Sequence, residues 1–259
     1  MRLMLAGIGA WVRRWLADVG HASLLFFRLL WLGPSCLKRF SLVRDQMHFL
    51  GNHSLAIIAV SGLFVGFVLA LQGYNTLQKF GSASALGLLV ALSLVRELGP
   101  VVSALLFTGR AGTSLTAEIG LMKAGEQLSA MEMMAIDPVS RILAPRFWAG
   151  MLVMPILGAV FSAVGIVGGW LVGVVMIGVD AGSFWGQMQD GVDVWSDVGN
   201  GFIKTVVFGL TVSFIALRQG FEAQATPEGV ARATTRTVVM ASLTVLALDF
   251  VLTALMFKL

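Results

Sequence analysis

Residues 55–71 read LAIIAVSGLFVGFVLAL, a run without a single charged side chain. A helix needs roughly 20 mostly apolar residues to cross about 30 Å of hydrocarbon, and this run with its neighbours is long enough. Four further stretches are similar, and the charges in their interiors are limited to Arg96, Glu97, Lys204 and Asp249. We therefore predict five transmembrane helices, at about residues 52–73, 83–109, 147–177, 199–218 and 237–257.

The overall composition supports a membrane protein. Hydrophobic residues make up 57% of the chain and charged residues 12%, whereas about 25% of the residues in a soluble domain are charged. Too few polar residues remain to cover a soluble surface, which excludes most soluble enzyme folds. We predict an all-α integral membrane protein, with residues 1–50 as an amino-terminal region and residues 51–259 as the five-span domain.

The amino-terminal residues 1–45 mix tryptophan and phenylalanine with basic residues, a pattern typical of helices that lie on the membrane surface. Arg13, Arg14 and Asp18 interrupt the first apolar stretch, so a cleavable signal peptide is not expected. We predict interfacial helices in this region. The alternative is one more spanning helix over residues 22–37.

Lysine and arginine decide the orientation, because they accumulate in cytoplasmic segments. With the amino terminus in the cytoplasm, 14 of them fall on the cytoplasmic side, against Lys79 and Lys258 on the other side. The outer loop at about residues 180–197 is acidic instead. We predict a cytoplasmic amino terminus and a carboxyl terminus on the opposite side. The 14 residues are Arg2, Arg13, Arg14, Arg28, Lys38, Arg39, Arg44, Arg110, Lys123, Arg141, Arg146, Arg218, Arg232 and Arg236.

The sequence lacks the residues that several classes of function require. The net charge is +4, but the basic residues flank apolar segments instead of forming one amphipathic face, so no nucleic-acid partner is expected. The single Cys36 permits neither an intramolecular disulfide nor a cysteine-based metal site. The sequence has no G-x-x-x-x-G-K-[ST] phosphate loop, no H-E-x-x-H and no G-x-S-x-G. We expect no catalytic residue, no metal and no cofactor in this chain.

Small residues repeat at four-residue spacing in two of the predicted spans. Gly62, Gly66 and Ala70 form one series, and Gly165, Gly169 and Gly173 form the other. Such spacing lets helix backbones approach closely. The pattern predicts a helical bundle, but it does not distinguish contacts within one subunit from contacts between two.

The charges inside the spans form the first candidate site. Arg96 and Glu97 lie midway along the second span, before Gly99 and Pro100, which loosen the helix. Arg96 points about 100° away from Glu97 around a helix, so we expect Glu97 to pair with Lys204 of the fourth span. Asp249 of the fifth span completes the predicted network. Its role is either to hold the bundle together or to face a lipid headgroup or gate a cavity.

The segment of residues 110–146 is too long to be a simple turn. Residues 126–136 are good helix formers, and Pro138 marks the end of this predicted helix. The helix would place Leu128, Met131 and Met134 on one side, with acidic residues around them. Such a surface either docks onto a partner or lies on the bilayer, and the spacing leaves both open.

Five runs together identify a family resemblance: ALSLVRELGPVVSALLFTGRAG, TAEIGLMKAGEQLSAMEMMAIDP, PRFWAG, ARATTRTVV and LDFVLTALMF. They resemble the MlaE permease family, the membrane subunit of a bacterial phospholipid transporter. The resemblance implies a homodimer in the inner membrane, bound to two copies of a cytoplasmic ATPase that holds ATP and Mg. It also implies a STAS-domain protein on the ATPase, a hexameric periplasmic MCE-domain protein and a phospholipid substrate, with a role in outer-membrane asymmetry.

The resemblance also implies roles for particular residues. The segment of about residues 124–138 would be a coupling helix that docks into the ATPase through Glu126, Met131, Glu132 and Asp137. Lipid would contact the outer end of the first span and the charges of the second, through Leu69, Gln72, Tyr74, Thr76, Leu77, Phe80, Arg96 and Glu97. Tyr74 has a second interpretation, as an interfacial anchor.

The resulting hypothesis is a lipid-transporting permease powered by a partner ATPase. Its rivals are an ion-coupled secondary transporter that uses the intramembrane charges, an intramembrane enzyme that acts on lipid, and a non-transporting scaffold.

Overall fold

The computed structural model describes residues 2–33 and 40–256, and in that part of the chain it contains helices and no strands. Segment η1 is a 3-10 helix, and η2 to η6 are π-helical. The elements in chain order are α1 (Arg2–Trp31), α3 (Phe40–Lys79), η1 (Ala83–Ala85), α4 (Leu86–Leu92), η2 (Ser93–Leu98), α5 (Gly99–Phe107), η3 (Thr108–Gly112), α6 (Thr113–Ala124), α7 (Gln127–Met133), η4 (Val139–Leu143), α8 (Ala144–Trp170), η5 (Leu171–Met176), α9 (Ala181–Gly191), η6 (Val194–Val198), α10 (Gly199–Glu222) and α11 (Pro227–Met256).

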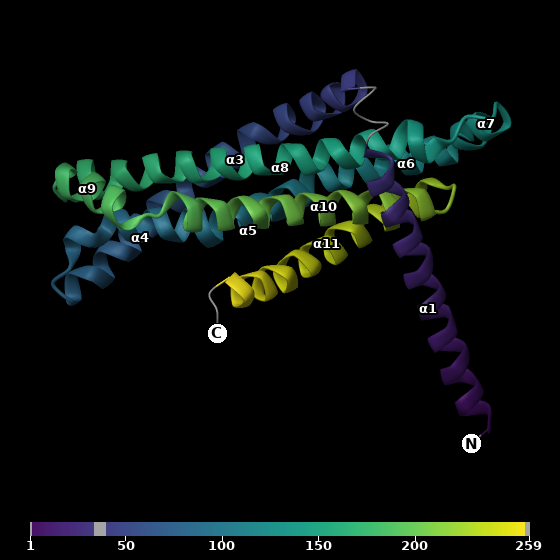
Figure 1. The fold of residues 1–259 in the computed structure, drawn as a ribbon, viewed down its shortest axis with the longest axis horizontal. Helices are drawn as coiled ribbons and strands as arrows, with labels where there is room; N and C mark the ends of the chain where they lie inside the picture. The colour runs from purple at the N-terminus through teal and green to yellow at the C-terminus, as the bar shows by residue number, and fades with distance from the viewer. Residues whose placement is uncertain (1, 34–39, 257–259) are drawn as a thin grey trace.

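Five helical stretches within the described residues are long and apolar enough to cross a membrane. The prediction of an all-α protein with five spanning helices is therefore confirmed. Most of these stretches lie side by side along the long axis of the molecule, and α11 diverges from them (Figure 1). The predicted end of the fifth span, residue 257, lies outside the described residues. The five stretches are Phe40–Lys79, Ala83–Ala124, Val139–Met176, Val194–Glu222 and Pro227–Met256.

The second stretch continues well beyond the predicted end at residue 109. It runs on through α6 because Leu115 and Ile119 are fully buried, which favours helix by tertiary packing. Arg110 contributes as well, since its Nη1 lies 3.4 Å from the carbonyl oxygen of Phe49 in α3. The segment that connects the second and third stretches is therefore shorter than expected.

The first glycine series brings α3 and α8 together within one subunit, while Gly169 and Gly173 of the second series pack against Val90 and Leu86 of α4. A Cβ atom on Gly62 would lie 2.7 Å from the carbonyl oxygen of Phe161, and one on Gly66 would collide with the carbonyl of Gly165. Only a glycine lets the two backbones come this close. The contact that the spacing left open is thus an intramolecular one.

The π-helical segment η2 carries Arg96 and Glu97 and precedes Pro100, which has no N–H to donate to the preceding turn. The turn before it is held from two sides, because the carbonyl of Leu94 accepts the backbone N–H of Gly99 and, at 3.2 Å, the Ser162 hydroxyl of α8. Proline and a π-helical turn together set the direction of the two charged side chains, as such segments often do at functional sites.

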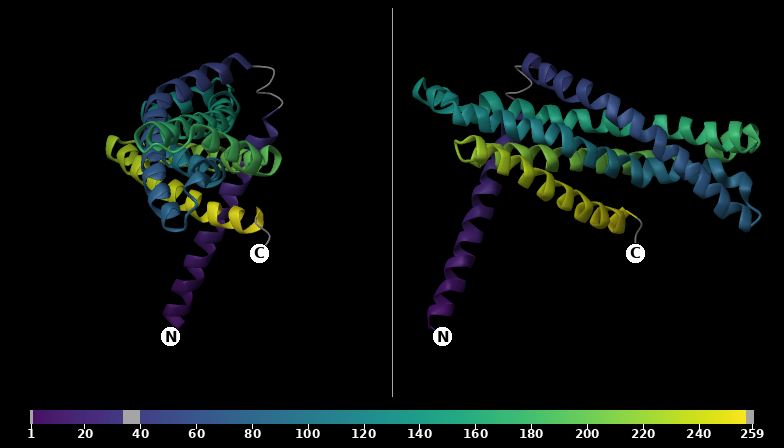
Figure 2. Two further views of the ribbon diagram at one scale, coloured as in Figure 1. Left: turned by 90° about the vertical axis from the view of Figure 1, so that its left-hand side faces the viewer. Right: turned by 180° about the vertical axis from the view of Figure 1, so that it is seen from behind.

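Helix α1 crosses the bundle steeply near the end that carries α6 and α7 (Figure 2). The carboxyl-terminal end of α1 is attached to the bundle. There Trp148 Nε1 donates to the carbonyl of Leu29 at 3.2 Å, and Arg28 pairs with Asp137 at 3.1 Å. The placement of α1 at the membrane surface stays a prediction. The alternative span over residues 22–37 ends outside the described residues.

Candidate functional site

Lys204 lies at the centre of a charge cluster that joins the second, fourth and fifth spanning stretches. Its Nζ is 2.6 Å from Glu97 Oε2 and 3.1 Å from Asp249 Oδ1. It also donates to Thr253 Oγ1 at 2.7 Å. The expected pair of Glu97 and Lys204 is present, and Thr253 is a member that sequence reasoning missed.

Burial makes this cluster structurally important. Lys204 is 1% exposed, and a charge near the bilayer centre costs at least about 2.5–3.5 kcal/mol unless it is paired. The Glu97 side chain is 35% exposed, and its buried Oε1 has no hydrogen-bond partner among the described residues. One carboxylate oxygen is thus left over after Lys204 has been paired.

Arg96 pairs with Asp197, which is not one of its predicted network partners Glu97, Lys204 and Asp249. Its Nε donates to Asp197 Oδ1 at 2.6 Å, and Asp197 is 1% exposed. The other carboxylate oxygen of Asp197 accepts the backbone N–H of Asp193 at 2.9 Å. The sequence placed Asp197 in the acidic outer loop; its position just before the fourth span was the signal that could have suggested this pairing.

An apolar groove of about 350 Å³ lies between α3 and η2. Its lining is Phe64, Val65, Val68, Leu69 and Leu98. Leu69 is therefore the residue of the predicted lipid-contact set that this groove includes. Of the others, Tyr74 and Leu77 pack against the core, whereas Gln72, Thr76 and Phe80 are exposed toward the end of α3.

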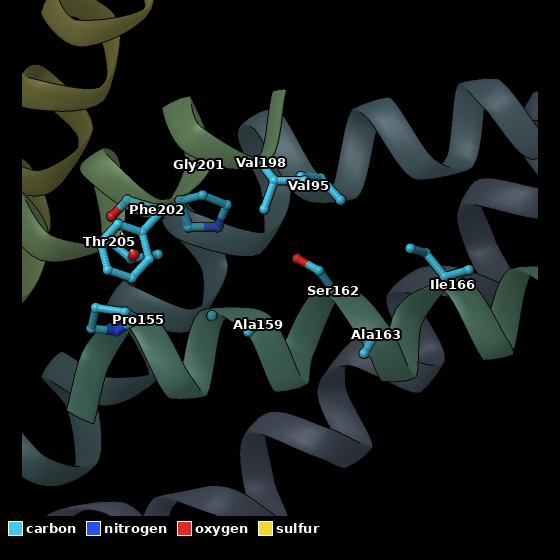
Figure 3. A pocket seen from close by; sticks show the side chains of 12 residues that line it. Val95, Pro155, Ala159, Ser162, Ala163, Ile166, Val198, Gly201, Phe202 and Thr205 are labelled. Carbon is cyan, nitrogen blue, oxygen red and sulfur yellow. Dashed lines mark hydrogen bonds between the residues drawn. The ribbon is translucent and has the colours of Figure 1, made fainter. Parts of the chain in front are cut away.

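Sequence reasoning missed a second apolar pocket, of about 260 Å³, between α8, α10 and η2 (Figure 3). Small side chains leave its space open, and those of α8 line one wall (Figure 3). Phe202 and Val95 close the opposite side. The signal in the sequence was the run of small residues after Pro155, which reads ILGAVFSAVG.

The segment between α6 and η4 differs from the predicted helix. Helix α7 covers only Gln127–Met133, because Glu126 and Ala135 both adopt a left-handed backbone with φ of 58°. Leu128 is buried and Met131 packs against the core. The exposed surface is formed instead by Met133, Met134 and Ile136, together with Glu126 and Glu132.

Asp137 is already engaged within the chain. Its carboxylate accepts the backbone N–H groups of Val139 and Ser140, both at 3.2 Å, and it pairs with Arg28 of α1. Of the four predicted coupling residues, Glu126 and Glu132 are therefore the exposed ones, while Asp137 caps η4.

In the described part of the chain, no group of three or more His, Cys, Asp and Glu residues is arranged to hold a metal ion.

These features define a multi-pass α-helical membrane protein of the permease type. The chain belongs to the MlaE permease family. The sequence model of this family, described as permease MlaE, matches residues 43–255. It is 56% identical over 253 residues to the intermembrane phospholipid transport system permease protein MlaE of Haemophilus influenzae, covering 98% of this chain and 97% of that protein. It is 36% identical to a probable ABC transporter permease protein of Rickettsia typhi (84% of each chain) and 33% identical to one of Synechocystis (83% and 81%).

Proposed function

We propose that this chain is the permease subunit of an ATP-driven phospholipid transporter of the bacterial inner membrane. The observation that carries the proposal is its 56% identity, over nearly the full length of both chains, to a protein named as an intermembrane phospholipid transport permease. In this role it moves lipid between the inner membrane and a periplasmic MCE-protein channel, which maintains outer-membrane asymmetry.

The geometry supports lipid as the substrate. A phospholipid needs an apolar surface for its acyl chains and polar groups for its headgroup. The groove that includes Leu69 is apolar throughout, and Leu98 of its lining belongs to η2, the segment that also carries Glu97. The polar end of the proposed lipid path is then the charge cluster around Lys204, whose Glu97 has a carboxylate oxygen to spare, together with the separate pair of Arg96 and Asp197.

The proposed assembly contains two copies of this chain, two copies of an ATPase that binds ATP and Mg, a STAS-domain protein and a hexameric MCE-domain protein. The exposed surface of Met133, Met134, Glu126 and Glu132 supports ATPase docking at α7, because methionine-rich surfaces adapt to partners. In this arrangement α7 and the amino terminus are cytoplasmic and the carboxyl terminus is periplasmic.

Reconstitution tests this function. The complex is purified with its neighbours, placed in vesicles with a fluorescent phospholipid, and assayed for transfer to the MCE-domain protein with ATP and with a non-hydrolysable analogue. We expect transfer that requires ATP hydrolysis. Transfer driven by a pH or sodium gradient without ATP would instead establish the ion-coupled alternative.

A further inference from the structure

A polar pocket of about 330 Å³ lies where α10 ends and α11 begins. This turn is at the same end of the bundle as α6 and α7 (Figure 1) and is separate from the charge cluster and both apolar pockets. Its lining residues are Gln219, Glu222, Ala223, Gln224, Gly229, Arg232, Ala233 and Arg236.

The pocket has an excess of positive charge. Glu222 is its only acidic lining residue, and it pairs with Arg218 at 2.8 Å. Arg236 has no ion pair with any residue that the structure describes. The pair of Arg232 with Glu228 is 3.8 Å long and joins side chains that are 79% and 87% exposed, so it holds Arg232 only weakly.

The side-chain amide of Gln219 adds a hydrogen-bond donor to the guanidinium groups of Arg232 and Arg236 in this pocket. Gln219 is 8% exposed, and the contact that its amide nitrogen makes is with Met240 Sδ, at 3.3 Å. Sulfur is a weak acceptor, so a stronger acceptor in the pocket would be preferred. Arginine guanidinium groups one helical turn apart suit the several oxygens of a phosphate group.

The α11 surface continues from this pocket as an apolar stripe. Arg236, Met240 and Leu243 follow one another at spacings of four and three residues, which places them on one helix face. Met240 is 40% exposed and Leu243 is 63% exposed. Helix α11 is also the least covered span, with 11% of its apolar window buried against 28–50% in the other four. A ligand that binds Arg236 through a phosphate would therefore have apolar surface directly beneath it.

We propose that the pocket of Arg232, Arg236 and Gln219 binds the phosphate group of a membrane phospholipid, whose acyl chains lie along Met240 and Leu243. The site is a lipid-anchoring site at the membrane surface, distinct from the transport groove. It does not depend on the proposed function, because a bound lipid at this position needs neither ATP nor transport.

Native mass spectrometry of the complete complex, released from nanodiscs that contain phosphatidylglycerol, tests the proposal. The double substitution Arg232→Gln with Arg236→Gln is expected to remove one retained phospholipid per copy of this chain, with the affinity of this site lowered about tenfold, because two charge-assisted contacts are lost. Lipid held in the transport groove should stay. Arg44→Gln, which removes an exposed arginine of α3 (side chain 70% exposed), is the matched control and should retain lipid normally. Arg236→Lys should give an intermediate value, since it keeps the charge and loses the planar fork.

Three results would overturn the proposal. One is unchanged lipid retention in the double variant while the control also retains lipid. Another is displacement of the lipid by inorganic phosphate at equal concentration, which would make this a site for free phosphate. The last is a loss of ATPase binding or of self-association in the double variant with lipid retention intact, which would make the pocket a protein interface.

Discussion

At the scale of single residues, Lys204 determines how the charges inside the bundle are arranged. Its ammonium group contacts one carboxylate of η2 and one of α11, so a single cation neutralises part of two acids. Removing one partner of a buried pair costs about 3–5 kcal/mol, because the remaining charge is left uncompensated. The cluster is therefore sensitive to the sign of each charge.

We predict that Glu97→Lys strongly impairs ATP-driven lipid transfer, since it places two ammonium groups together. The double change Glu97→Lys with Lys204→Glu should restore part of the transfer, and adding Asp249→Asn should restore more, because the reversed pair otherwise places a carboxylate against Asp249. Transfer rates in reconstituted vesicles, together with melting temperatures, measure both effects. A double variant no better than the worse single one would remove the support for direct pairing.

At the scale of elements, the close contact of α3 and α8 depends on glycines. We predict that Gly66→Ala destabilises the protein by about 1–3 kcal/mol or more, because the added methyl meets the backbone of Gly165 and no side chain can move aside. Gly109→Ala is the control, since a Cβ at that helical position meets no atom within 4 Å. Thermal unfolding in detergent measures the difference. Equal melting temperatures for the two variants would mean that the helices separate more easily than this packing indicates.

The short helix α7 carries the second element-scale prediction. Glu132→Lys is expected to weaken ATPase association at least about fivefold while leaving the bundle folded, because Glu132 is exposed and the change reverses its charge. Asp45→Lys, on the exposed start of α3 with a side chain 64% exposed, serves as the control. Pull-down of the ATPase and lipid transfer are measured together. Normal association of the Glu132 variant would exclude this residue from the docking surface.

At the scale of the whole molecule, the orientation in the membrane follows from the basic residues at the α7 end. In a Cys36→Ser background, Ser129→Cys is expected to resist labelling by an impermeant thiol reagent in intact spheroplasts, because α7 is cytoplasmic in the proposed topology. Gln189→Cys in α9, at the opposite end, should be labelled and serves as the positive control. Labelling of the Ser129 variant before lysis would reverse the topology.

The sequence by itself determined the fold class and the number of spans. Transfer of a helix into hydrocarbon depends on about 20 consecutive residues and on few others, so it can be read locally. The same local reasoning predicted that Glu97 needs a cationic partner on another helix, because the cost of an unpaired charge does not depend on the details of packing.

Only the tertiary structure decided which residues meet. Arg96 and Asp197 are 101 positions apart, so no local pattern showed which of the acidic residues pairs with Arg96. The pair of Glu97 and Lys204 was predicted, because Lys204 was the lysine available inside another span, but the contact of Lys204 with Thr253 came only from the packing. Packing also extended the second stretch to Ala124 and turned Leu128 and Met131 toward the bundle, which changed the exposed surface of α7. The pocket of Arg232 and Arg236 likewise exists because two helix ends meet there, and the relative position of helix ends is set by the packing of the whole bundle.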